Sequence, residues 1–147
     1  MFVISISITK MFIVVQNKIY SMKKLTQAEE EVMQKVWDLE KGLVKDVLNL
    51  FSEPKPNYNT IATVLKVLEK KGFVNHKAYG TTYEYYPAVT KDEYAQSQFG
   101  DFIGKYFNNS FPKLASFFAK NNNLSLAEME EILKMTEQQL KSENKNL

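Results

Sequence analysis

Apolar and polar positions between residues 57 and 72 recur with the period of an α-helix. Ile61, Leu65 and Leu68 fall on one face of that helix, at the spacing expected for packing against a core. Asn57 is a favourable N-cap and Gly72 a favourable C-terminal stop, so both helix ends are specified locally. The opposite face is polar and carries Asn59, Thr63, Lys66 and Lys70. We expect one face to pack and the other to be free to contact a partner.

The pattern changes to that of a β-hairpin after Gly72. Residues 73–79 and 81–87 are rich in aromatic and β-branched side chains and are separated by Gly80, which predicts two antiparallel strands. The two-residue period of a strand divides the tyrosines between surface and core. These are Tyr79, Tyr83, Tyr85 and Tyr86. A helix with a polar outer face that leads directly into a hairpin is typical of a DNA-binding winged helix-turn-helix.

Two further helices are predicted before this unit. Thr26 and Glu29 form a capping box for the first helix, and Gly42 marks its end. Its apolar face comprises Ala28, Val32, Met33, Val36 and Leu39, with Trp37 expected in the core. The second helix covers residues 43–51, and prolines then predict a turn. The predicted fold is mainly α with a small β-hairpin, a winged helix-turn-helix domain over residues 23–90.

Helical patterns also fill residues 91–147. We expect one helix after the capping residue Thr90 and another after the capping residue Ser125. A short helix is expected between them, over residues 111–120. Three amphipathic helices are too few for an independent core, so this region is predicted to pair two copies as a homodimer. The expected dimer contacts are Phe99, Phe102, Ile103, Tyr106, Met129, Ile132 and Leu133. A ligand pocket is the alternative use of these aromatic side chains.

Residues 1–22 form an apolar N-terminal extension interrupted by Lys10 and Lys18. The stretch is too short and too broken to span a bilayer, and it lacks the features of a signal peptide, so we expect no stable membrane association. Three interpretations are open: an added edge strand, an unstructured extension, or translated sequence upstream of the real start. We favour the last, because a domain begins in the ordinary way at Met22.

The composition excludes several kinds of site. The 147 residues contain no cysteine and a single histidine, His76. Thiolate and multi-histidine metal sites are therefore excluded, and no conventional catalytic set is present. We expect no enzymatic activity, no metal and no other cofactor. His76 is instead expected to be a surface residue of the hairpin, near a DNA phosphate.

The net charge of +2 is unevenly distributed along the chain. Residues 55–80 hold five lysines against one glutamate, a net +4, whereas residues 92–147 hold six lysines against eight acids, a net −2. A basic segment that coincides with the predicted reading helix favours nucleic acid as the partner. All nineteen basic residues are lysine, so bidentate arginine readout of guanine is excluded.

The predicted DNA contacts follow from these positions. Lysines are suited to phosphates, whereas Asn59 and Thr63 are suited to base edges. The full set is Asn59, Thr60, Thr63, Lys66, Lys70, Lys77, Tyr79 and Thr81. On periodicity alone, a solvated helix face is an equal alternative for the polar positions of the helix.

Several motifs together resemble the penicillinase repressor family, the BlaI, MecI and CopY group of bacterial transcription regulators. They are Leu25-Thr26-Gln27-Ala28-Glu29, Val36-Trp37, Asn59-Thr60-Ile61, Leu68-Glu69-Lys70-Lys71-Gly72-Phe73, His76-Lys77-Ala78-Tyr79-Gly80 and Tyr85-Tyr86-Pro87. The resemblance covers roughly residues 23–137. It implies a cytoplasmic, homodimeric winged-helix repressor that binds a palindromic double-stranded DNA operator and controls a resistance or stress-response gene. It also places Asn59, Thr60, Thr63 and Lys66 in the reading helix and residues 77–81 in the wing.

Departures from the family pattern limit what the resemblance implies. Arginine is common in the family where Val67 stands here, so no operator sequence is carried over. In β-lactam-responsive members, a membrane sensor-protease system leads to repressor cleavage at an Asn-Phe bond, and the aligned pair here is Phe117-Phe118. The copper-responsive branch carries cysteine pairs that this chain lacks, which excludes that route of copper sensing.

Two classes of function are open. The first is a sequence-specific, dimeric transcriptional repressor, which the hairpin and the family resemblance favour. The second is a winged-helix protein-interaction module in which the basic face is incidental. An enzyme would need a catalytic constellation, and the sequence offers none.

Overall fold

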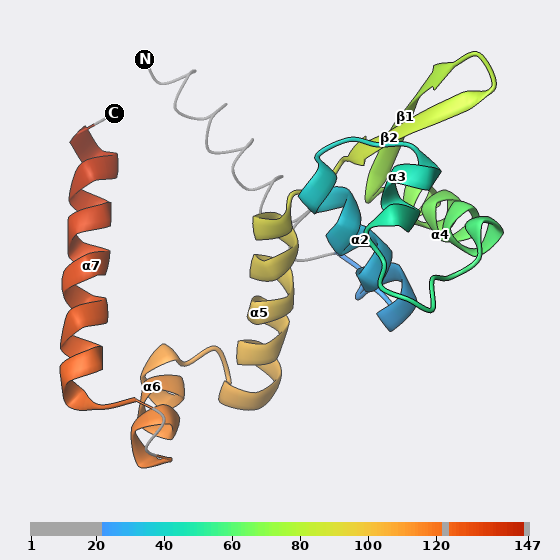
Figure 1. The fold of residues 1–147 in the computed structure, drawn as a ribbon. Helices are drawn as coiled ribbons and strands as arrows, with labels where there is room; N and C mark the ends of the chain where they lie inside the picture. The colour runs from blue at the N-terminus through green and yellow to red at the C-terminus, as the bar shows by residue number, and fades with distance from the viewer. Residues whose placement is uncertain (1–21, 122–123, 146–147) are drawn as a thin grey trace, which may run out of the picture. The chain divides into compact units, whose positions relative to one another are not determined.

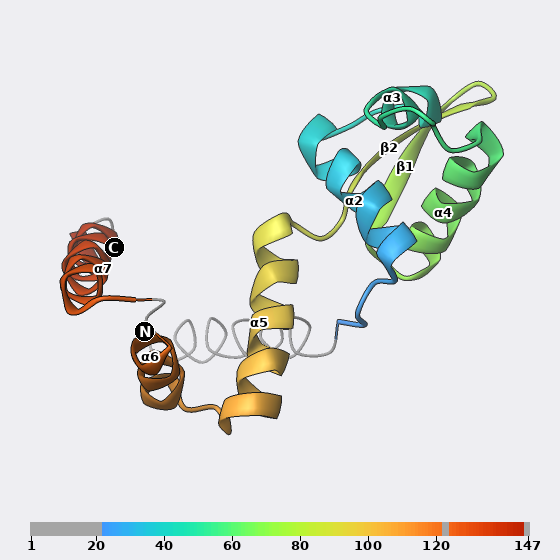
Figure 2. The ribbon, with the colours of Figure 1, turned by 60° about the horizontal axis from the view of Figure 1, so that its bottom comes forward.

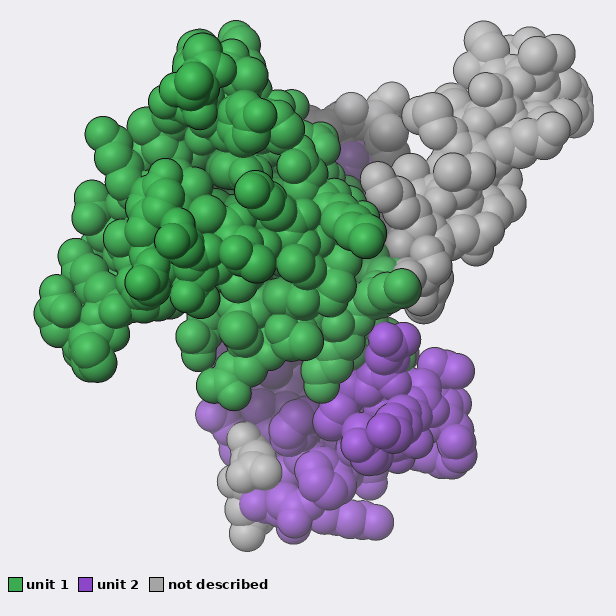
Figure 3. Space-filling model, turned by 90° about the vertical axis from the view of Figure 1, so that its right-hand side faces the viewer, with its two compact units in different colours: residues 1–100 green, residues 101–147 purple. Residues whose placement is uncertain are grey.

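The computed structural model describes residues 22–121 and 124–145. The chain divides into two compact units, residues 1–100 and 101–147 (Figure 3). The expected N-terminal extension lies outside the described residues, apart from Met22. The helices and strands of both units are labelled in Figure 1.

Unit 1 has the predicted winged-helix order (Figures 1 and 2). Its elements are α2 (Gln27–Leu39), α3 (Val44–Asn49), α4 (Tyr58–Lys70), β1 (Val74–Tyr79), β2 (Thr82–Pro87) and the first part of α5 (Lys91–Phe107). The strands pair antiparallel from Val74 with Pro87 to Tyr79 with Thr82, so Gly80 and Thr81 form the turn. The tip of this hairpin extends beyond the three helices that precede it. The predicted mainly α fold with a small hairpin is confirmed.

One apolar core joins the elements of unit 1. The predicted face of α4 is confirmed, because Ile61, Leu65 and Leu68 are at most 1% exposed. Tyr94 of α5 also lies in this core, where its hydroxyl accepts a hydrogen bond from the Leu25 N–H at 3.1 Å. Burial raises the pKa of Tyr94. The core of unit 1 therefore extends past residue 90 into α5.

The predicted apolar face of α2 is wrong at one position. Ala28 is exposed, and the neighbouring Glu29 is buried instead. The Glu29 carboxylate accepts a hydrogen bond from the Lys71 ammonium at the end of α4, with Nζ 2.7 Å from Oε2. That hydrogen bond lowers the pKa of Glu29 against the opposing effect of burial. Glu29 also completes the predicted capping box with Thr26.

The sequence predicted that the first helix ends at Gly42, and this prediction is wrong. Instead, α2 ends at Leu39 and Glu40 turns the chain with a φ of 62°. Gly42 forms a backbone bridge to the hairpin, donating to the Tyr85 carbonyl at 2.9 Å and accepting from the Tyr85 N–H at 2.8 Å. A Cβ at Gly42 would lie 3.1 Å from Leu39 Cδ1 and 3.3 Å from Asp46 Cβ. The residue therefore fits a tight connection that is bonded to β2.

Unit 2 comprises the end of α5, α6 (Phe111–Lys120) and α7 (Leu126–Lys145). The predicted bounds of α6 are confirmed, and the Ser110 side chain caps it by accepting from the Lys113 N–H at 3.3 Å. Gly104 of α5 lies beside Asn109, whose side-chain Oδ1 would lie 3.1 Å from an added Cβ.

The C-terminal apolar side chains are largely uncovered in the single chain. None of the described residues of α7 is buried, and Leu133 is 65% exposed. Among the predicted dimer contacts, Phe99, Phe102, Tyr106, Ile132 and Leu133 are exposed, Met129 is half-buried and Ile103 is buried. Phe117 and Phe118, the pair aligned with the family's cleavage site, are both exposed on α6. The dimer contact and the cleavage site stay predictions.

Candidate nucleic-acid interface

The outer face of α4 is built by its cap and its buried stripe. Asn57 begins the helix, because its side-chain oxygen accepts a hydrogen bond from the Asn59 N–H at 2.9 Å. Packing of Ile61, Leu65 and Leu68 then fixes the rotation of the helix about its axis. The polar positions opposite are all exposed: Asn59, Thr60, Thr63, Lys66 and Lys70.

Thr63 presents a specific set of atoms on this face. Its hydroxyl donates a hydrogen bond to the Asn59 carbonyl at 2.8 Å, one helical turn earlier. The hydroxyl proton is therefore already used, but the oxygen lone pairs and the methyl group remain available. Such a side chain can accept a hydrogen bond from an amino group of a base or contact a thymine methyl group.

The hairpin carries the remaining predicted contacts near its tip. Lys77, Tyr79 and Thr81 are exposed, and Gly80 turns the chain with a φ of 61°. The Lys77 ammonium lies 5.2 Å from the centroid of the Tyr79 ring, so charge and aromatic surface occur together. The predicted division of the tyrosines also holds. Tyr85 is buried, with its pKa raised by desolvation, whereas Tyr79, Tyr83 and Tyr86 are exposed.

A groove of about 400 Å³ lies between α4, α3 and the hairpin. Its lining includes two lysines, Lys45 of α3 and Lys66 of α4, and the hydroxyl-bearing residues Tyr58, Thr81 and Thr82. Ammonium and hydroxyl groups are the donors that bind phosphate oxygens in protein–DNA complexes. The groove is therefore chemically suited to a nucleic-acid backbone running between the helix and the wing.

Sequence reasoning missed part of this groove. Lys45 was assigned no role, although it falls on the polar side of the short helix whose buried face contains Val47. Tyr58 and Thr82 were missed as well. Each is the first residue of its helix or strand, where the hydrophobic period says little about which way a side chain points. The missed signal was the lysine on a helix adjacent to the predicted reading helix.

His76 contacts two neighbours within unit 1, and its expected position beside a phosphate stays a prediction. Its Nδ1 contacts the Glu69 carboxylate of α4. The ring also stacks on Tyr83, with the ring centroids 4.2 Å apart. A carboxylate at this position would repel a phosphate, because both are anionic. His76 therefore links the hairpin to α4.

The described residues hold no group of three or more His, Cys, Asp or Glu side chains arranged to bind a metal ion. Within the same residues, no helix combines the length and the apolar character needed to cross a membrane.

Among solved structures, the chain is similar to the solution structure of the DNA-binding domain of the repressor BlaI. The two sequences are 29% identical, the TM-score is 0.44, and the match covers 50% of this chain and 92% of that one.

Similarity to full-length relatives covers most of the chain. The penicillinase repressor of Bacillus licheniformis is 29% identical over 121 residues, which are 80% of this chain and 94% of the relative. The methicillin resistance regulatory protein MecI of Staphylococcus aureus is 28% identical over 117 residues, which are 79% and 93% of the two chains. The family model described as penicillinase repressor matches residues 25–138. This match covers unit 1 from Leu25 onwards and most of unit 2, and the chain therefore belongs to the penicillinase repressor family.

Proposed function

We propose that this chain is a sequence-specific, DNA-binding transcriptional repressor that acts as a homodimer on a palindromic operator. The observation that carries the proposal is the donor-lined groove between α4 and the hairpin, which adjoins the exposed polar face of α4. Membership of the penicillinase repressor family supports it. The names of the relatives point to control of a resistance gene. Such a protein acts in the cytoplasm, where the operator lies.

In this proposal, α4 reads bases and the groove holds the DNA backbone. Asn59 and Thr63 supply base contacts, because their side chains are exposed and can meet hydrogen-bonding groups at base edges. Lys66 and Lys70 contact phosphates, and neither ammonium group has an acidic partner among the described residues. Lys77, Tyr79 and Thr81 extend the contact along the wing. Lys45 joins this set from α3.

The homodimer is supported by the uncovered apolar side chains of unit 2. Leu126, Ile132, Leu133 and Leu140 of α7 are each at least 50% exposed. Apolar faces of this kind mark protein–protein contacts. A second copy of the chain is the economical partner, because a two-fold symmetric pair presents two copies of α4 to the two halves of a palindrome. Half-sites would then lie about 34 Å apart, or a multiple of that spacing.

We further propose that a membrane sensor-protease system acts upstream of the repressor and relieves repression by causing its cleavage. The bond between Phe117 and Phe118 lies in the exposed α6, where a protease can reach it after local unfolding. Cleavage there would separate α7 from unit 1. Loss of α7 would remove apolar surface from the proposed dimer contact and thereby weaken operator binding.

A gel-shift titration against the DNA upstream of the protein's own gene tests the proposal. A repressor should give a complex that survives an excess of unrelated competitor DNA and weakens steeply as salt rises. The alternative, a protein-interaction module, predicts no complex or one that competitor DNA removes completely. The second result would refute the proposed function.

A further inference from the structure

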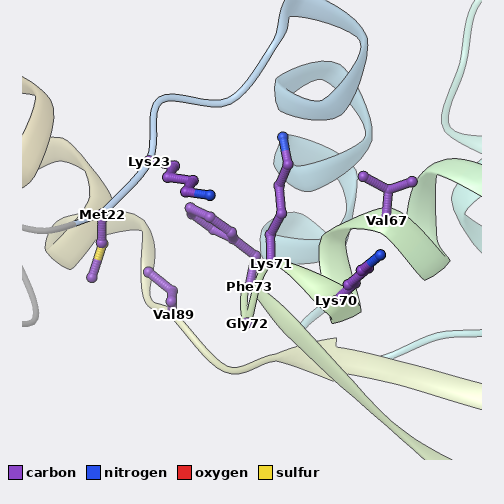
Figure 4. Close-up of a pocket in the computed structure, with 8 residues that line it drawn as sticks. All are labelled: Met22, Lys23, Val67, Lys70, Lys71, Gly72, Phe73 and Val89. Carbon is purple, nitrogen blue, oxygen red and sulfur yellow. The ribbon is translucent and has the colours of Figure 1, made fainter.

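A second concavity, of about 760 Å³, lies in unit 1 at the C-terminal end of α4 (Figure 4). Its volume is within the range of small-molecule sites. Its lining comes from the segment before α2, from the end of α4 and from the segment between β2 and α5. The residues that matter here are Met22, Lys23, Lys70, Lys71, Phe73 and Val89.

The apolar part of this site is centred on Phe73. Figure 4 shows Met22 and Val89 on one side of its ring, and Lys70 on the other side. Phe73 is only 2% exposed and packs edge-on against Tyr94, with the ring centroids 5.7 Å apart. The floor is therefore held by the core of unit 1, and it offers a fixed apolar surface to a bound molecule.

The polar part of the site is cationic. Of its three lysines, Lys71 is neutralised by Glu29, whose Oε2 lies 2.7 Å from Nζ. Lys23 and Lys70 have no acidic partner among the described residues. Two uncompensated ammonium groups beside an apolar floor complement a small organic anion.

We propose that this concavity binds a small amphipathic carboxylate. Its apolar body packs against Phe73, and its carboxylate is held by Lys23 and Lys70. Lys70 also belongs to the outer face of α4, where the proposed function assigns it to a DNA phosphate. The ligand and the phosphate then compete for one ammonium group, so the ligand lowers DNA affinity. This second step depends on the proposed function, whereas ligand binding does not.

Ligand binding is tested on the full-length ¹⁵N-labelled chain without DNA. The probes are benzoate and 1-naphthoate, with benzyl alcohol and inorganic phosphate as controls for the charge and the apolar body. We expect saturable shifts of the Gly72 and Phe73 amides with the carboxylates, larger and at lower concentration for 1-naphthoate. The proposed site is refuted if neither carboxylate shifts these amides. It is also refuted if benzyl alcohol or phosphate shifts them as much as the carboxylates do.

A matched pair of lysine variants tests the assignment of Lys23. Lys23→Gln should weaken 1-naphthoate binding severalfold, because it removes one of the two ammonium groups. Lys24→Gln makes the same charge change one residue away, at an exposed side chain that is not part of the lining. It should leave binding unchanged. Equal weakening by both variants shows a general charge effect and overturns the site.

The effect on DNA is tested by fluorescence anisotropy with the same upstream DNA, at constant ionic strength. Saturating 1-naphthoate should weaken DNA binding at least threefold. Lys23→Gln should shift this effect to severalfold higher 1-naphthoate concentrations without changing DNA affinity in the absence of ligand. Amide shifts with unchanged DNA affinity overturn the competition. A chain that binds no DNA refutes the proposed function, and the amide shifts still decide whether the carboxylate site exists.

Discussion

Glu29 and Lys71, 42 positions apart in the sequence, form an ion pair that joins the start of α2 to the end of α4. The Glu29 residue is 8% exposed, so the carboxylate is largely removed from water. It nevertheless stays ionised, because two oxygens accept from the ammonium group and one also accepts from the Thr26 N–H. The pair therefore holds α4 to α2, the helix that begins the domain.

We expect Glu29→Gln to lower the free energy of unfolding by about 1 kcal/mol at pH 7, because it removes a charge-assisted hydrogen bond. The Glu29 pKa is lowered from 4.5 in the folded chain. Its stabilisation is therefore complete above the pKa of the unfolded chain and is lost as pH falls through the folded pKa. Urea unfolding followed by Trp37 fluorescence should show the difference between wild type and variant shrinking to zero as pH falls below the lowered Glu29 pKa.

The control for this prediction is Glu31→Gln, an exposed glutamate on the same helix whose carboxylate accepts a hydrogen bond from the Gln27 side chain. It should change the free energy of unfolding by less than about 0.5 kcal/mol at any pH. A constant difference between wild type and Glu29→Gln from pH 7 to pH 3 would show that the ion pair does not carry the stabilisation.

Thr63→Ala should relax sequence preference more than it weakens binding. We expect a loss of about 1 kcal/mol of discrimination at one base pair of each half-site, because the oxygen and methyl group that meet the base edge are removed. Anisotropy titrations with single-base operator variants measure this. Thr63→Ser retains the hydroxyl and separates the two contributions. An unchanged preference in both variants would mean that Thr63 does not face bases.

Lys45→Gln should weaken binding to all DNA sequences alike. Lys45 lines the groove between α4 and the hairpin, so its loss should remove a proposed phosphate contact and lower the slope of log affinity against log salt by about 1. Lys24→Gln, which makes the same charge change outside the groove, is the control. Identical salt slopes for these two variants would place the DNA backbone elsewhere.

Leu133→Glu should convert the proposed dimer to a monomer. Leu133 is 65% exposed in the single chain, and a glutamate there would be desolvated in a dimer contact. Sedimentation velocity should show the smaller species, and operator affinity should fall with it. Gln138→Glu adds the same charge on the opposite side of α7 and should leave the dimer intact. A wild-type chain that sediments as a monomer would refute the dimer itself.

The parts of unit 1 that could be predicted are those whose signals are local. The start of α4 at Asn57, its end before Gly72 and the hairpin turn at Gly80 are each specified by one or two residues. The buried stripe of α4 follows from its own periodicity. The exposure of the predicted DNA contacts follows from the same pattern, because it fixes which side of the helix faces out.

The parts that could not be predicted depend on contacts between distant residues. Periodicity placed Ala28 in the core, but the pairing of Glu29 with Lys71 decides the orientation of that turn. Nothing near Gly42 in the sequence indicates its bridge to Tyr85. Lys45 becomes part of the groove only when α3 packs beside α4 and the hairpin.

The hairpin is held near its root on two sides, by the backbone of Gly42 and by the contact between His76 and Glu69. Beyond these points its strands pair with each other and end in the Gly80 turn. A hairpin anchored in this way is fixed at its base, and its tip is the part that can bend to follow the curvature of a DNA groove. A force on the tip would be transmitted through the anchoring contacts to the α2–α3 connection and to α4. DNA that deflects the tip would therefore work against the whole helical scaffold, which couples the fit of the wing to the seating of the reading helix.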